Sequence, residues 1–204
     1  DANHFQISSG GDVGLAVGGN LTRNVSLAGA VPTYGANAES QPQPTSFQSG
    51  TISDVGNLKL TDGLLATGSW YDGTNVGFRN DADNGAPQPQ VTFYLGALYD
   101  VATVDIWTVS AFLGSNESVS ISSSIDGVTF GPPVVVNPLV WTGGFPNTNL
   151  QKATVDVSSL PDGWYFRIEV LDPGQWMMIN EVEFTGTAVP EPATTALLGL
   201  GGLA

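Results

Sequence analysis

Residues 90–95 read Gln-Val-Thr-Phe-Tyr-Leu. The apolar residues Val91, Phe93 and Leu95 alternate with residues that carry a polar group, with a period of two. Such alternation is typical of a β-strand that buries one face and leaves the other in contact with solvent. A longer candidate strand follows at 101–112. On it, Val104 and Ile106 fall on one face and Trp107 on the other. The two stretches together predict a β-sheet at the centre of the chain.

Similar segments recur along the rest of the sequence at fairly regular spacing. The further candidate strands are 118–122, 128–130, 134–136, 153–157, 164–170 and 176–184. Loops rich in Gly and Pro separate them, and the segment 32–50 is expected to be such a loop. Many short strands, without any long helical pattern, predict an all-β protein built as a β-sandwich or jelly roll.

The charge of the chain limits its partners. It carries 19 acidic and 5 basic residues, a formal net charge of −14, and no cysteine. A surface this acidic repels phosphate groups, so we expect neither nucleic acid nor an anionic membrane as a partner. Without cysteine the chain has no disulfide and no thiolate metal site. Divalent cations and neutral polymers remain compatible with this charge.

The polar residues mark no catalytic site, so we do not expect an enzyme. The one histidine, His4, lies near a terminus, where no Ser/His/Asp arrangement can be assigned around it. Asp and Glu are numerous, but no spacing marks a pair of catalytic carboxylates. The stretch 80–85 contains Asp81 and Asp83 but lacks the spacing of a calcium loop, which favours a solvated acidic turn.

The end of the chain predicts its destination. The tripeptide 190–192 reads Pro-Glu-Pro, and a small apolar run occupies 193–204. This pattern resembles the PEP-CTERM sorting signal of exported bacterial proteins, although the run is too short to span a bilayer and no Arg cluster follows. The resemblance implies a secreted protein of the cell surface or extracellular matrix, with transient membrane contact through an incomplete tail, 188–204. The start at Asp1, without an apolar leader, is what we expect of a mature form.

The order of the segments is similar to a known fold family, the discoidin-type, galactose-binding-like jelly roll of coagulation-factor C domains and many carbohydrate-binding modules. The match covers residues 22–187 and leaves 1–21 as an N-terminal extension. The segments that carry it are 24–28, 58–63, 90–96, 101–107, 118–127, 164–170 and 179–186.

The resemblance implies one structural calcium ion, which would join the loop at 61–63 to the last strand. Carried over residue by residue, Asp62 and Glu181 would each supply a carboxylate oxygen. Calcium takes six to eight hard oxygen ligands, which suits such a donor set. The alternative is that Asp62 only caps a turn. The remaining ligands would be backbone oxygens near Lys59, Thr67 and Asn180.

Aromatic residues in loops are the candidate saccharide contacts. Sugar-binding proteins stack a pyranose on an aromatic ring and hydrogen-bond its hydroxyls with polar side chains. The candidates are Tyr71, Phe78, Trp141 and Phe145, with Arg79 and Asn80 as polar contacts beside Phe78. The alternative for each ring is that it covers an end of the sandwich. We expect Trp70, Trp107, Trp164 and Trp176 in the core, and Arg167 to pair with a carboxylate.

Taken together, the residues and the resemblances predict an exported protein that binds extracellular-matrix polysaccharide through a calcium-stabilised β-sandwich. The alternative is a structural subunit that assembles with copies of itself into a surface filament or layer. The extension 1–21 favours this alternative, because Phe5 and Ile7, like Leu15 and Val17, alternate with small or polar residues. A segment of this kind could pair with the open sheet edge of a neighbouring copy.

Overall fold

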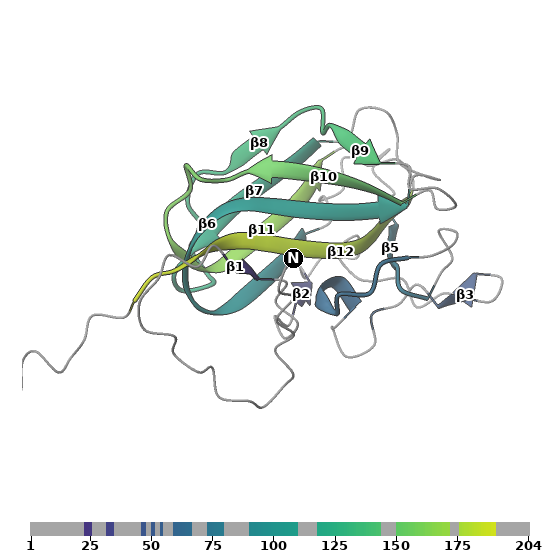
Figure 1. Cartoon of the computed structure of the whole chain (residues 1–204), viewed down its shortest axis with the longest axis horizontal. Coiled ribbons are helices and arrows are strands. Elements are labelled where there is room, and N and C mark those ends of the chain that lie inside the picture. Colours follow the sequence, from purple (N-terminus) through teal and green to yellow (C-terminus); the bar gives the residue numbers. More distant parts are fainter. Residues whose placement is uncertain are drawn as a thin grey trace, which may run out of the picture.

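A computed structural model gives the fold of the chain (Figure 1). The residues it describes are 23–25, 32–34, 46–47, 50–51, 54, 59–66, 73–79, 90–109, 118–143, 150–171 and 176–190. The N-terminal extension 1–21, the acidic stretch with Asp81 and Asp83, and the tail from Glu191 lie outside the described residues, so predictions about them stay predictions. Within the described residues no helix is long and apolar enough to cross a membrane.

Strand β6 (Gln90–Val109) organises the fold, because its two halves pair with different neighbours. Its first half pairs with β2 (Pro32–Tyr34) on one edge and with β11 (Gly163–Leu171) on the other. Its second half pairs with β12 (Trp176–Ala188) and with β10 (Leu150–Asp156). All these pairings are antiparallel. The strand therefore belongs to both layers of a sandwich and connects them covalently.

The first layer extends from β11 to β7 (Ser118–Ser124) and then to β8 (Val134–Val136). In the second layer β10, β6 and β12 lie side by side (Figure 1). The short strands β9 (Trp141–Gly143), β1 (Arg23–Val25) and β5 (Val76–Arg79) extend this layer, the first beside β10 and the other two along β12. A hairpin of β3 (Ser46–Phe47) and β4 (Gly50–Thr51) and a 3-10 turn, η2 (Lys59–Thr61), complete the described elements.

The core lies between the two layers and follows the alternation seen in the sequence. Phe93 on β6 and Phe166 on β11 are fully buried, and both rings contact Phe184 from the opposite layer. The ring centroids of Phe93 and Phe184 are 5.3 Å apart in an edge-on arrangement, which is a favourable aromatic contact. A β-sandwich was predicted from these alternating stretches, and the structure confirms an all-β sandwich.

Several local predictions were wrong. The stretches 90–95 and 101–112 are not two strands: one strand runs through 90–109, and Gly96 accommodates its course with a positive φ of 76°. The segment 128–130 is not a strand but part of a turn. Short strands occur where loops were expected, such as β2 within 32–50 and β9 at Trp141. Strands of three residues owe their form to the neighbouring strand that pairs with them, so their own sequence carries no readable period.

Gly186 gives a direct test of how closely β12 and β6 approach. A Cβ at this position would lie 2.3 Å from the carbonyl oxygen of Asp100 and 2.8 Å from Cα of Val101, and both obstacles are backbone atoms. Because backbone cannot swing aside, we expect Gly186→Ala to lower the free energy of unfolding by about 2 kcal/mol or more. Gly73→Ala is the matched control, because a Cβ there meets nothing within 4 Å. Equal chemical-denaturation midpoints for the two variants would contradict the close approach.

Candidate functional site

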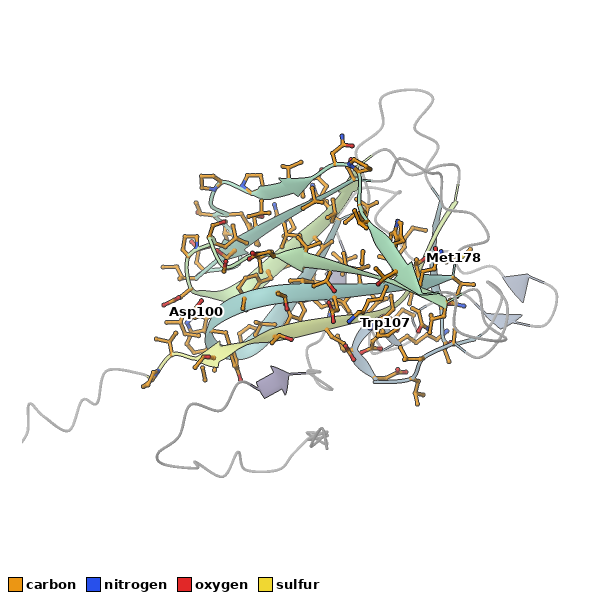
Figure 2. The ribbon with its side chains drawn as sticks, turned by 45° about the horizontal axis from the view of Figure 1, so that its top comes forward. Asp100, Trp107 and Met178 are labelled. Carbon is orange, nitrogen blue, oxygen red and sulfur yellow. The ribbon has the colours of Figure 1, made fainter. Side chains whose placement is uncertain are left out.

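Glu181 is the most unusual polar residue among those the structure describes. Its side chain is 0% exposed, and within the described residues neither carboxylate oxygen has a hydrogen-bond partner. A break in the register of β12 and β6 between Ile179 and Glu181 creates this placement. Ile179 joins the main core, whereas Glu181 lies opposite Trp107 on the other face of the layer. Trp107 and Asp100 occupy opposite ends of the second half of β6 in Figure 2.

The environment of Glu181 opposes its ionisation. Burial, with smaller contributions from the neighbouring carboxylates of Asp62 and Glu183, raises the pKa of the Glu181 carboxyl to about 9. The backbone amides of Gly63 and Asp62 lie close enough to lower the pKa in part, but neither completes a hydrogen bond. A buried carboxylate without partners is costly, so the group either keeps its proton or meets a cation.

Asp62 lies next to Glu181 in the loop that follows η2. Its Oδ1 accepts a hydrogen bond from the backbone N–H of Leu64 at 2.8 Å, so the turn-capping role expected as an alternative is present. Burial raises the pKa of Asp62, and the charge of Asp54 adds to this effect. Asp54 itself accepts a hydrogen bond from the backbone N–H of Lys59 at 3.0 Å. Acidic groups therefore gather around this loop, as a cation site requires.

The side chain of Asn180 forms hydrogen bonds that link β12 to Ala66 and Thr74. The amide oxygen accepts the backbone N–H of Ala66 at 3.0 Å, and the amide nitrogen donates to the backbone oxygen of Thr74 at 3.3 Å and to its hydroxyl at 3.1 Å. The side chain of Asn180 is thus already used. Any contribution to a metal would come from its backbone oxygen, as the sequence resemblance implied.

The donor set fits a calcium ion held partly by backbone oxygens. In the described part of the chain no group of three or more His, Cys, Asp or Glu side chains could hold a metal. Two carboxylates, Asp62 and Glu181, are nevertheless adjacent, and the oxygens of Glu181 have no protein partner. Calcium accepts backbone carbonyls as readily as carboxylates, so a loop can complete its shell. Thr67, expected to supply one such oxygen, lies outside the described residues.

The predicted saccharide contacts are only partly visible. Phe78 was expected to be a surface ring, but this was wrong: it is 0% exposed in the core, because β5 pairs with β12 and turns the ring inward. Trp141 is half-buried and packs against the core, which matches the alternative reading of this ring. The backbone of Arg79 ends β5, but its side chain is not described. Tyr71, Asn80 and Phe145 lie outside the described residues.

Two other expectations were wrong and lead to a surface that sequence reasoning missed. Trp164 was expected in the core, but it is only partly buried and stacks on Tyr94 with ring centroids 6.1 Å apart and planes at 8°. Arg167 was expected to pair with a carboxylate, but its guanidinium lies 3.7 Å from the ring centroid of Phe130. The signal was present in the alternation, which puts Tyr94 and Arg167 on the face opposite the core residues.

Tyr94 and Arg167 border a depression on the outer face of the first layer. Tyr94 is 40% exposed, and its ring centroid lies 4.9 Å from that of Tyr165 on the paired strand. The depression has a volume of about 250 Å³. Its lining residues are Thr33, Gln90, Thr92, Tyr94, Gly127, Tyr165 and Arg167. Aromatic rings beside hydroxyl, amide and guanidinium groups are the surface that saccharides bind.

Comparison with known proteins supports the fold. No protein-family model matches the chain, and no curated protein matches it. A fucose binding module of Streptococcus pneumoniae is similar in structure, with a TM-score of 0.50 and 15% identity over 83% of this chain and 99% of that one. A fucolectin from striped bass (Morone saxatilis) serum gives a TM-score of 0.52 and 17% identity over 87% of this chain and 53% of that one.

A third similar structure is the C-terminal domain of a chitobiase from Bacteroides fragilis. It gives a TM-score of 0.50 and 14% identity over 80% of this chain and 99% of that domain. At such identities the likeness establishes the arrangement of strands and not the ligand. The chain therefore has the fold of an all-β, discoidin-like jelly-roll sandwich.

Proposed function

We propose that this chain is a polysaccharide-binding protein, without catalytic activity, that is exported to the cell surface or extracellular matrix and stabilised by calcium. One observation carries the saccharide part: the cluster of Tyr94, Trp164 and Tyr165 on the outer face of the first layer, beside polar groups. Partly exposed aromatic rings beside hydrogen-bonding groups form the kind of surface that binds saccharides. The similar structures include a fucose binding module and a fucolectin, which supports the same function.

The calcium part of the proposal rests on Glu181. A cation between Glu181 and Asp62 would neutralise a carboxylate that otherwise has no partner within the described residues. It would also join the loop after η2 to β12, so its role is to stabilise the sandwich. Lys59, Thr67 and Asn180 are the proposed sources of backbone oxygens. Export to the surface rests on the sequence of the tail alone.

We expect the protein to be retarded in native gels that contain polysaccharide, with one or more members of a panel of neutral and acidic polymers. Tyr94→Ala should weaken this retardation severalfold, because a stacked ring contributes on the order of 1 kcal/mol. Val140→Ala is the control, since Val140 is also exposed, at 73%, but does not line the depression. Absence of retardation on every polymer, with calcium present, would overturn the binding function and favour the self-assembling subunit, which electron microscopy would then reveal as filaments or layers.

The raised pKa of Glu181 predicts how stability depends on pH when calcium is removed. A carboxyl with a higher pKa in the folded than in the unfolded chain favours folding below the unfolded value, and this advantage is lost as pH rises toward the folded pKa. The stability is therefore lost in the pH window between the ordinary Glu pKa of 4.5 and the folded-state pKa of about 9. Relative to Glu181→Gln, the wild type should lose about 3 kcal/mol of unfolding free energy between pH 4 and pH 7. Denaturant titrations in chelator measure this difference.

At pH 7, addition of calcium should restore the stability that the wild type loses relative to Glu181→Gln in chelator. The wild type should gain stability with each increase in calcium, by about 2.7 kcal/mol at a hundredfold excess over the dissociation constant, whereas Glu181→Gln and Asp62→Asn should gain little. Asp156→Asn is the matched control, because Asp156 is an exposed carboxylate bonded to Ser158. A wild-type melting temperature that ignores both chelator and calcium would refute the calcium site without affecting the saccharide proposal.

A further inference from the structure

The depression on the first layer is crossed by a row of residues from three paired strands. Thr33 on β2 lies opposite Thr92 on β6, and Thr92 lies opposite Arg167 on β11. The next pair along the same face is Tyr94 and Tyr165. Because residues two apart on a strand share a face, these side chains all point away from the core. Arg167 therefore stands beside the aromatic wall of the depression, with hydroxyl groups on its other side.

Among the residues that the structure describes, Arg167 is a cation without an anionic partner. In the described part of the chain its guanidinium meets no carboxylate within ion-pair distance, although the sequence holds 19 acidic residues against 5 basic ones. Lys152 on the other layer behaves differently: its Nζ contacts Oδ2 of Asp105 at 2.8 Å. The ring of Phe130 covers one face of the Arg167 guanidinium at 3.7 Å. Stacking of this kind holds the planar group in place and leaves its N–H edge for a ligand.

The rim of the depression is held in position before any ligand binds. Oδ1 of Asp126 accepts hydrogen bonds from the backbone N–H groups of Val128 and Thr129, each at 2.8 Å. Gly127 follows with a φ of 72°, and a Cβ there would come within 3.0 Å of the Tyr165 ring. Glycine at position 127 therefore suits both the positive φ of the turn and its close packing against the Tyr165 ring. The same segment places Phe130 over Arg167.

We propose that this depression binds one carboxylated sugar unit, a uronic acid residue within a longer polysaccharide, with Arg167 contacting the carboxylate. The inference rests on the proposed saccharide function and names its ligand class. The volume of about 250 Å³ lies below the roughly 300–1,000 Å³ of pockets for drug-sized ligands, which suits one ring of a chain that continues over the surface. Tyr94 and Tyr165 supply the apolar wall. A guanidinium binds a carboxylate through two parallel N–H···O bonds, which selects an acid over a neutral sugar.

Isothermal titration with trigalacturonate and with its fully methyl-esterified form tests the proposal, because the ester keeps the sugar rings and replaces each carboxylate by an uncharged methyl ester. We expect the wild type to bind the acid at least about tenfold more tightly than the ester. Arg167→Gln should abolish this preference, and Arg167→Lys, which keeps the charge but loses the paired donors, should restore part of it. Lys152→Gln is the control: it removes a cation that is already paired, from the opposite layer, and should leave both affinities unchanged. Calcium is held constant throughout, so that calcium bridging to the acidic ligand affects every variant equally.

Three results would overturn the proposal: equal affinity of the wild type for acid and ester, an undiminished preference in Arg167→Gln, or equal losses in Arg167→Gln and Lys152→Gln. Thermal melts of each variant confirm that the fold is retained. Retention of a neutral polysaccharide alongside any of these results would remove the uronate assignment and leave the saccharide-binding function in place. Failure to bind any saccharide, charged or neutral, would remove both.

Discussion

The shared strand β6 is the constraint on which the rest of the structure depends. Each half of β6 pairs on both of its edges, so the hydrogen bonds of two layers meet in one continuous segment, 90–109. The same strand places both candidate sites. Its first half carries Tyr94 on the outer face of one layer, and its second half carries Trp107 opposite Glu181. The positions of both sites therefore depend on the registers in which this one strand pairs with its neighbours.

The sequence was a good guide wherever one face of a strand is buried for its whole length. Val91 and Phe93 are buried between exposed or half-buried neighbours, as their alternation predicted. Phe78 could not be placed in the same way, because β5 has only four residues and its burial depends on the partner strand β12. The prediction for Trp164 was wrong because the register between β11 and β6 shifts beside it. A residue that strict alternation would direct inward is therefore only partly buried.

At the candidate sites, too, some features could be inferred from the sequence, whereas others depend on contacts between residues that are distant in the chain. The pairing of Asp62 with Glu181 was inferred from a resemblance in sequence order, and the structure brings the two residues together. No local sequence pattern predicted the environment of each charged group. Arg167 looked like a buried ion-pair partner because apolar residues flank it, yet the identity of its contact is set by Phe130, which reaches it from the turn beyond β7. A side chain's partner depends on tertiary packing, whereas its face on a strand without a register shift follows from parity.

The turn at Asp126 has a consequence for the release of a bound ligand. Hydrogen bonds from Thr129 and Val128 lower the pKa of Asp126 to about 2, so the turn keeps its acceptor while ordinary carboxylic acids, which titrate near 4, become neutral. Because the stabilising carboxylate persists until the pH falls to its own pKa, mild acid leaves the rim beside Tyr165 and Arg167 in place. A free sugar acid would lose its charge before Asp126 does, because its carboxyl titrates near 4, and would then no longer be held by a guanidinium. Capture would then be reversible by acidification alone, with the empty surface ready to bind again on neutralisation.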